Sequence, residues 1–223
     1  MRKAHLSSRL KWNGLVFDTK HFGEVVVEDY ISCDQFVVRF KDTGNIATVT
    51  ASQLKGGRVK DTSVPTVCGV GVTNGVRTQV DGKRLREYTY WQSMLIRCYD
   101  KNFKIKNPTY LDCEVSESFK DYSYFFDWCK TQKGFNVLGW QLDKDILGDG
   151  TIYSEDVCVF VPQELNSFFK KKEGLTMIDC IHSVFESEIR TNKLMSIIDQ
   201  HKDNLDQRVL KMFDFADRMK LFN

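Results

Sequence analysis

The chain has little of what membrane and secreted proteins need. No stretch of its 223 residues approaches the roughly 18 to 20 consecutive apolar residues of a membrane-spanning helix. The first eight residues, Met-Arg-Lys-Ala-His-Leu-Ser-Ser, contain no apolar signal-peptide core. These absences predict a protein of the cytoplasm with no membrane partner.

Cysteine pairs at metal-site spacing are also missing. The chain has seven cysteines, an odd number, and no two of them form a Cys-x-x-Cys pair. This pattern indicates neither a zinc knuckle nor a disulfide framework. We expect reduced, mostly buried thiols that behave as small hydrophobic side chains.

Apolar residues are plentiful enough for a folded core. Hydrophobic residues make up 42% of the chain and aromatic residues 13%, and a chain of this length forms one large or two small domains. Short β-rich runs alternate with turn residues near the N-terminus, at residues 14–17, 23–31, 35–40 and 46–50. We expect residues 1–71 to form a small β-barrel-like domain, similar to an SH3 module, with Phe36, Val38 and Phe40 on its buried side.

The net charge of +2 hides a strong asymmetry along the chain. Residues 55–106 carry eleven Lys or Arg against four acids, whereas residues 107–165 carry four basic against eleven acidic side chains. A basic segment beside an acidic one suggests that one part holds a polyanion and the other a cation such as a metal ion. The alternative is that the two segments pair with each other across an interface.

Helical and hairpin patterns follow the β-rich region. Residues 72–86 form an expected basic linker, in which Asn74-Gly75 and Asp81-Gly82 are turn signals that could close a hairpin. Apolar residues at helical spacing predict two core-facing helices, near 87–99 and 119–130. Residues 173–223 keep a helical pattern with no proline, which predicts a helical tail of two or three helices.

Residues 140–166 have the layout of two strands and a helix. Trp140–Ile146 reads as a strand, Gly148-Asp149-Gly150 as a turn, and Tyr153–Val161 as a return strand. Pro162 suits the first turn of a following helix. We expect residues 87–172 to form one module, with this ββα unit backed by the two helices.

This unit resembles the HNH (His-Me finger) homing endonucleases of bacteriophages, in which an Asp-His pair ends the first strand and a helix Asn or His completes a divalent-metal site. The resemblance extends over most of residues 12–170. It also rests on 41–44, 54–61, Pro65, 68–71, 91–99, 108–110 and Trp128.

The resemblance implies specific roles for four residues. Asp143 and Asn166 match the metal-binding positions, and Asp145 could add a third oxygen ligand, so Mg²⁺ is the implied cofactor. Lys144 stands at the catalytic position where the family has its general-base His. The flanking acids favour a charged ammonium, so the resemblance implies a degenerate site. The four histidines of the chain, His5, His21, His182 and His201, all lie outside this unit.

A polyanion partner would be held by the basic residues of the middle segment. Arginines can form two-pronged phosphate bonds, and lysines act as point charges. No helix-turn-helix or zinc-finger spacing is present, so the pattern predicts contacts with the DNA backbone and not a base-reading code. The candidate DNA-binding residues are Arg77, Lys83, Arg84, Arg86, Arg97, Lys101, Lys104 and Lys106.

The sequence therefore predicts an α+β protein that binds duplex DNA, with lost or weak cleavage. Two alternatives stay open. One is an active Mg²⁺-dependent endonuclease or nickase in which another residue replaces the His. The other is a phage protein that keeps the fold and binds a host or phage protein, for instance to inhibit a host defence.

Overall fold

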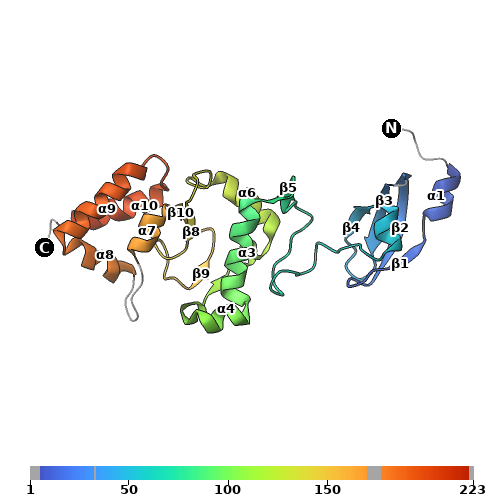
Figure 1. Cartoon of the computed structure of the whole chain (residues 1–223), viewed down its shortest axis with the longest axis horizontal. Helices are drawn as coiled ribbons and strands as arrows, with labels where there is room; N and C mark the ends of the chain where they lie inside the picture. Colours follow the sequence, from blue (N-terminus) through green and yellow to red (C-terminus); the bar gives the residue numbers. More distant parts are fainter. Residues whose placement is uncertain (1–5, 33, 170–176, 221–223) are drawn as a thin grey trace. The chain divides into compact units, whose positions relative to one another are not determined.

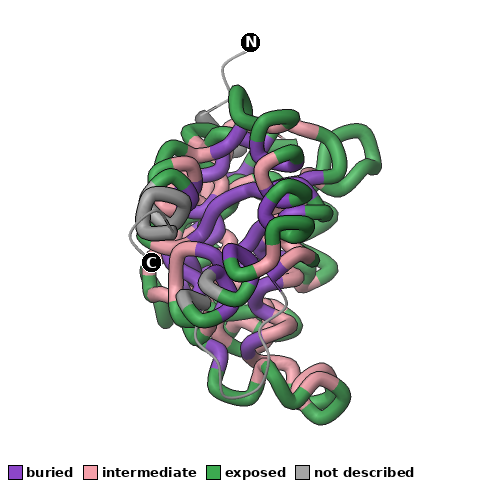
Figure 2. The backbone as a smooth tube through the Cα atoms, turned by 90° about the vertical axis from the view of Figure 1, so that its left-hand side faces the viewer, coloured by how far each residue is buried: buried purple, intermediate pink, exposed green. Residues whose placement is uncertain are grey.

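The protein has a mixed α+β fold that divides into two compact units (Figure 1). The structure is a computed structural model, and it describes residues 6–32, 34–169 and 177–220. Unit 1 comprises residues 1–66 and 72–75, and unit 2 comprises residues 67–71 and 76–223. Each unit has its own hydrophobic core. Figure 2 marks the buried stretches of backbone along the chain. Cys33 and the expected boundary at 172/173 lie outside the described residues.

Unit 1 is an open antiparallel sheet and not the expected closed barrel. Its four strands pair in chain order, so β1 and β4 are the two edges. The alternation of apolar and polar residues places Phe36, Val38 and Phe40 on the buried face, as predicted. The strands are β1 (Val16–Asp18), β2 (Glu24–Ser32), β3 (Gln35–Phe40) and β4 (Ile46–Val49).

Two short helices accompany this sheet. Helix α1 (Leu6–Trp12) brings the Trp12 ring edge-on to Phe36, with ring centroids 5.0 Å apart. Helix α2 (Ala51–Lys55) begins with a capping box, in which the Thr50 side chain accepts from the Gln53 N–H and the Gln53 side chain accepts from the Thr50 N–H.

The Cys68–Gly71 segment belongs to unit 2, although the sequence placed residues up to 71 in the N-terminal domain. Its turn packs against helix α3 (Arg86–Tyr99), where a Cβ added at Gly71 would lie 2.4 Å from Leu95 and 2.8 Å from Trp91. Only glycine fits at this distance, which explains a glycine at the point where the chain meets the second core.

The elements from 79 to 131 build the first part of unit 2. The Asp81-Gly82 turn closes a hairpin. Both residues have positive φ values, 49° and 73°, which a two-residue hairpin turn of this kind requires. Buried side chains at 91, 94, 95 and 98 confirm the helical stripe predicted for residues 87–99. The elements are β5 (Gln79–Val80), β6 (Lys83–Arg84), α3 (Arg86–Tyr99), α4 (Lys101–Lys106), the 3-10 turn η1 (Pro108–Tyr110), β7 (Glu114–Val115), α5 (Glu117–Lys120) and α6 (Tyr122–Thr131).

The strand, strand and helix expected over 140–166 occur at the predicted places, but the strands are short. Strand β8 (Gln141–Asp143) pairs antiparallel with β10 (Val159–Val161), and α7 (Gln163–Phe168) starts directly after Pro162. Between them, β9 (Ile152–Tyr153) pairs in parallel with β7 instead of extending the hairpin. The long connection from 144 to 158 is therefore held by neighbouring elements.

Three further helices form the C-terminal part of unit 2, as the helical pattern predicted. They are α8 (Met177–Phe185), α9 (Glu188–His201) and α10 (Gln207–Lys220). Their apolar faces join the same core as the β8–β10–α7 unit, through Val184, Leu194 and Val209 among others. Arg208 adds polar anchors by donating to the Asp156 carbonyl at 2.6 Å and the Cys158 carbonyl at 3.1 Å. None of the helices that the structure describes is both long and apolar enough to cross a membrane.

Candidate functional site

Asp143 lies at the end of β8, opposite Val159 of β10, with only 3% of its surface exposed. Its Oδ1 accepts hydrogen bonds from the backbone N–H groups of Asp145, at 3.0 Å, and Ile146, at 2.8 Å. Burial raises the pKa of Asp143 to about 6, the Asp145 charge adds to this rise, and the two backbone N–H groups oppose it. The carboxyl therefore fixes the turn that follows β8 by accepting these two hydrogen bonds. Its burial at the same time disfavours its charged form.

Lys144 is buried and its ammonium is surrounded by partners. The Nζ atom donates to Asp145 Oδ1 at 2.7 Å and to the Gly150 carbonyl at 2.6 Å, and the Cys113 thiol donates to the same carbonyl at 3.3 Å. It lies 5.7 Å from the ring centroid of Tyr110 and 5.4 Å from that of Tyr153.

These partners keep the ammonium charged. Burial by itself lowers the pKa of Lys144, but the charge and hydrogen bond of Asp145 outweigh it, so the pKa is raised. A general base needs a free lone pair near neutral pH. In this arrangement Lys144 is a cation that ties residues 144–150 together.

Asn166, on α7, contacts strand β8 at Gln141 and not at Asp143. Its side-chain Nδ2 donates to Gln141 Oε1 at 2.5 Å. Gln141 and Asp143 are two residues apart on one strand, so they share a face and lie about 7 Å apart along it. Asn166 therefore contacts the strand that ends in Asp143, and a shared metal site of the two residues stays a prediction.

The donor atoms suit magnesium in kind, and the geometry suits it in part. A carboxylate and an amide oxygen are ligands that Mg²⁺ accepts, with water or phosphate in the remaining positions. Asp143 Oδ1, however, is already held by two backbone N–H groups, and the Asn166 amide is bonded to Gln141. Within the described residues, no group of three or more His, Cys, Asp or Glu side chains is placed to hold a metal ion. The magnesium site stays a prediction.

Three of the predicted DNA-binding arginines have contacts within unit 2. Arg84 Nη1 donates to Gln92 Oε1 at 2.8 Å, and its guanidinium lies 5.6 Å from the ring centroid of Tyr88. Arg97 is partly buried and donates to the Tyr153 hydroxyl at 3.3 Å, which places it beside the Lys144 cluster. Arg86 donates to the Val137 carbonyl at 2.9 Å and lies against the rings of Tyr90 and Phe135. The guanidinium groups of Arg86 and Arg97 hold unit 2 together.

Six of the predicted DNA-binding residues, including Arg84, form two groups, one before and one after α3. The hairpin group is Arg77, Lys83 and Arg84, and all three are exposed. The α4 group is Lys101, Lys104 and Lys106, of which Lys104 is partly exposed and the other two are exposed. Helix α3 has 14 residues, so the groups flank an axis about 21 Å long.

These six cations are not neutralised by protein carboxylates. Within the described residues, none of them has a side-chain nitrogen within 4 Å of an Asp or Glu oxygen; the ion pairs in the acidic segment are Lys120–Glu117, Lys130–Asp127 and Lys144–Asp145. No ion pair in that part of the chain joins the basic segment to the acidic one. The alternative in which the two segments pair with each other across an interface stays a prediction.

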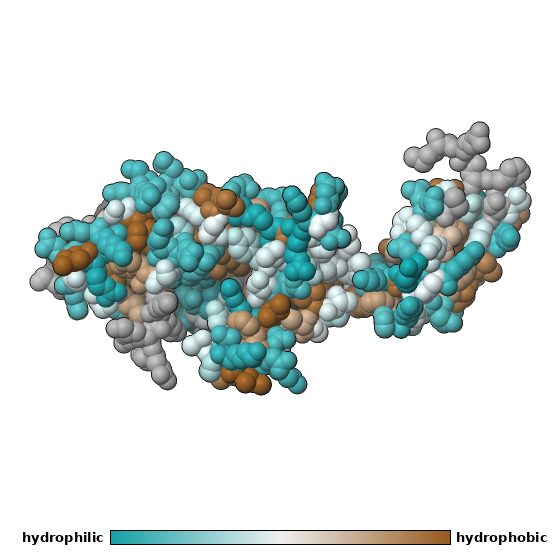
Figure 3. Space-filling model, viewed as in Figure 1, coloured by the Kyte–Doolittle hydropathy of each residue, from teal (hydrophilic) through white to brown (hydrophobic). Residues whose placement is uncertain are grey.

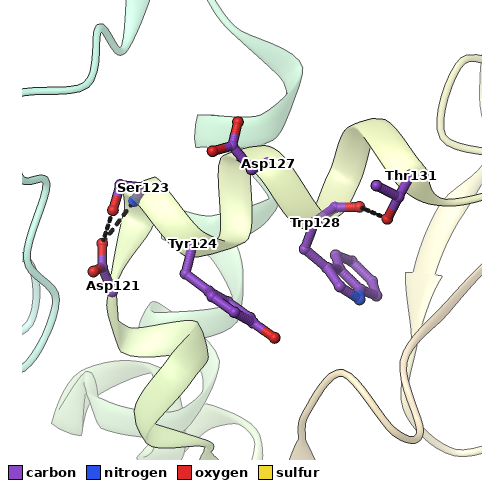
Figure 4. A pocket seen from close by; sticks show the side chains of 6 residues that line it. All are labelled: Asp121, Ser123, Tyr124, Asp127, Trp128 and Thr131. Atoms are coloured by element: carbon purple, nitrogen blue, oxygen red, sulfur yellow. Dashed lines mark hydrogen bonds between the residues drawn. The ribbon is translucent and has the colours of Figure 1, made fainter.

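A shallow pocket of about 490 Å³ lies along α6, away from the Asp-Lys-Asp turn in sequence (Figure 4). The Asp121 carboxylate, which caps α6, accepts from the Ser123 N–H and hydroxyl, both at 2.7 Å. Sequence reasoning did not identify it, because Trp128 was expected to belong to an aromatic core-facing stripe. The pocket is lined by Asp121, Ser123, Tyr124, Asp127, Trp128 and Thr131.

The contacts that hold the Asp-Lys-Asp turn were also missed from the sequence. Cys113, Tyr110 and Tyr153 surround the Lys144 ammonium, although Cys113 and Tyr110 lie more than 30 residues before it. The six described cysteines are free thiols and five are buried, as expected.

Comparison of the chain with known proteins finds no matching protein family, no matching curated protein and no matching solved structure. The resemblance to HNH endonucleases stays a prediction.

Proposed function

We propose that this protein binds duplex DNA through its phosphate backbone and does not cleave it efficiently. The observation that carries the proposal is the set of six cations, on the β5–β6 hairpin side and on α4, that have no carboxylate partner within 4 Å among the described residues. Uncompensated Lys and Arg side chains on an exposed surface attract a polyanion, and each phosphate contact releases counterions.

The Asp-Lys-Asp turn supports the second half of the proposal. Lys144 occupies the position that the resemblance gives to a general base, and its raised pKa and two hydrogen-bonding partners suit a fixed cation better than a proton acceptor. Phosphodiester hydrolysis needs an activated water as well as a metal ion. A chain with this turn is better suited to holding DNA than to cutting it.

The salt dependence of binding tests the proposal. We expect log affinity for a short duplex to fall linearly with log salt concentration, with a slope set by the number of phosphates contacted. Replacing Lys83, Arg84 and Lys101 with Gln should flatten this slope by about two to three units. Fluorescence anisotropy of a labelled duplex at several salt concentrations measures both quantities.

A matched control has the same loss of charge elsewhere in unit 2. Lys193, Lys202 and Lys211 are exposed on or beside α9 and α10, and their replacement with Gln should leave the slope unchanged. Equal slopes for the two triple variants would mean that binding depends on net charge alone and would overturn the assignment of the interface. Absence of binding by the unaltered protein at low salt would overturn the function itself.

The alternative of an active nuclease has one observation in its favour. The buried Asp143 has a raised pKa, and a carboxyl held in an unfavourable place is a common feature of functional sites. If this reading is correct, divalent ions should produce nicked plasmid in amounts that exceed the protein, and Asp143→Asn should abolish the nicking.

A further inference from the structure

The corner formed by α4 and η1 exposes two large apolar side chains among lysines. Ile105 is 77% exposed and Leu111 is 58% exposed, and both lie in the segment Lys101–Leu111, named here the α4 corner. Figure 3 shows apolar surface at the position of α4, at the lower edge of the view, next to hydrophilic surface. Single exposed apolar residues are common on proteins, so the surroundings of these two decide what they indicate.

The α4 corner is held rigidly by its own contacts. The rings of Phe103 and Tyr110 pack edge to face with centroids 5.6 Å apart, and Lys104 Nζ donates to the Leu111 carbonyl at 2.8 Å. Asp100 caps the helix by accepting from the Phe103 N–H at 2.7 Å. Ile105 and Leu111 are therefore presented to solvent by a backbone that these contacts hold, and Tyr110, the partner of Phe103, packs against the core of unit 2.

Positive charge surrounds Ile105. Lys101 lies one helical turn before it, on the same face, and Lys104 and Lys106 are its neighbours in sequence. Over residues 101–112 the three lysines face a single acid, Asp112. An apolar tip surrounded by cations is complementary to DNA, in which a stack of apolar base faces is flanked by two rows of phosphates.

We propose that the α4 corner is a DNA wedge: Ile105, supported by Leu111, inserts between base pairs from the minor groove while the neighbouring lysines bind phosphates. This inference rests on the proposed DNA-binding function and adds the contact that would bend the duplex. Apolar side chains used in this way partly unstack one base step and kink the DNA toward the major groove. The hairpin cations, about 21 Å away along α3, would bind phosphates about six base pairs distant at 3.4 Å per base pair.

A lipid surface is a weaker match for the same corner. Membrane-surface helices need a large apolar face, and α4 has six residues with one exposed apolar side chain. DNA requires only one inserted residue.

The test uses the full-length protein and a duplex that carries 2-aminopurine, whose fluorescence rises when its base step is unstacked, with a second duplex labelled at both ends for energy transfer. The unaltered protein should raise the 2-aminopurine signal and bring the duplex ends closer. Ile105→Ser with Leu111→Ser should abolish both signals and weaken binding about fivefold to tenfold, with the slope of log affinity against log salt unchanged. Both side chains are exposed, so these substitutions remove no core contact.

Ile189→Ser provides the matched control, because Ile189 is 83% exposed on α9. It should leave unstacking, bending and affinity unchanged. If the unaltered protein binds DNA with a steep salt slope but neither unstacks nor bends it, the wedge is overturned and the proposed function stands. If it does not bind DNA at low salt, both are overturned. If Ile105→Ser instead releases the protein from anionic vesicles or dissociates a dimer in sedimentation experiments, the corner serves that partner and the wedge is overturned.

Discussion

Asp143 and Lys144 are neighbouring residues of opposite charge. Their surroundings disfavour the charged form of Asp143 and favour the charged form of Lys144. Both are almost completely buried. Asp143 is held by two backbone N–H groups in a place that raises its pKa, whereas Lys144 has a carboxylate, a carbonyl and a thiol around its ammonium. The Lys144 ammonium has its hydrogen-bond partners, whereas burial disfavours the ionised Asp143 carboxylate. Substitution of Lys144 should therefore destabilise the protein, and substitution of Asp143 should stabilise it above pH 6.

The first prediction at this scale concerns Asp143 and pH. An Asp in an unfolded chain titrates near pH 4, and the pKa of Asp143 is raised to about 6 in the folded chain. The folded state therefore binds this proton more tightly, and stability falls as the pH rises from 4 to 6, by about 3 kcal/mol at most. Asp143→Asn keeps an oxygen for the two N–H groups and should remove this fall.

Urea denaturation of both proteins at several pH values between 4 and 8 measures the effect. The free energies of unfolding should differ little near pH 4 and diverge above pH 6, where the Asn variant is the more stable. Parallel curves would contradict the raised pKa. The same samples test the metal: if Mg²⁺ binds Asp143, it should stabilise the unaltered protein at pH 7.5 and leave Asp143→Asn unchanged.

At the scale of elements, the connection between β8 and β10 is organised by contacts from outside it. Lys144 reaches the Gly150 carbonyl, β9 pairs with β7, and Arg208 of α10 donates to carbonyls at 156 and 158. Asp149 caps its own turn by accepting from the Thr151 N–H and hydroxyl. A segment of 15 residues is thereby held in one conformation although it has only two residues of strand.

Lys144→Met tests this organisation. The methionine fills similar space but leaves the Gly150 carbonyl and Asp145 without their cation, which should destabilise the protein by about 2 to 3 kcal/mol, a figure reduced because Asp145 is partly exposed. Amide hydrogen exchange should rise most at residues 144–152 and little in α3. Exchange that rises uniformly, or not at all, would show that Lys144 does not hold this segment.

Local patterns predicted the elements well because they act over a few residues. The alternation in Phe36–Phe40, the stripe from Trp91 to Cys98 and the Asp81-Gly82 turn each specify a structure by themselves. The parallel pairing of β7 with β9 was not predicted, because two-residue strands 38 positions apart carry no periodic signal. The same limit explains the expected barrel: a run of four strands indicates a meander, and closure depends on whether the first and last strands meet.

The candidate site was predicted less completely than the fold. The adjacency of Asp143, Lys144 and Asp145 is a local fact and could be read directly, as could the basic composition of 77–106. The sequence does not show which arginines can contact a ligand. Arg86 and Arg97 donate to Val137 and Tyr153, which lie about 50 residues further along the chain. Sequence composition gives the number of cations in a segment, and tertiary packing determines how many remain for DNA.

At the scale of the whole molecule, the distribution of charge matters more than its sum. The net charge is only +2, yet the exposed cations before and after α3 have no carboxylate within 4 Å in the described part of unit 2. Cations without a carboxylate partner produce a positive field that is screened within about 10 Å at 0.1 M salt. Binding to DNA should therefore be strong at low salt and weak at high salt.

One gel experiment tests the central claim, that the protein holds duplex DNA and does not cut it. Supercoiled plasmid is incubated with the pure protein at low salt, with Mg²⁺, with Mn²⁺ or with EDTA, and each sample is run before and after the protein is removed by detergent and protease. We expect retarded plasmid in all three conditions, and plasmid that is still supercoiled once the protein is removed. Retardation should disappear at high salt.

Nicked or linear plasmid in the Mg²⁺ or Mn²⁺ samples, produced at many turnovers and lost in Asp143→Asn, would contradict this claim in favour of an active nuclease. Plasmid that is never retarded would contradict DNA binding itself.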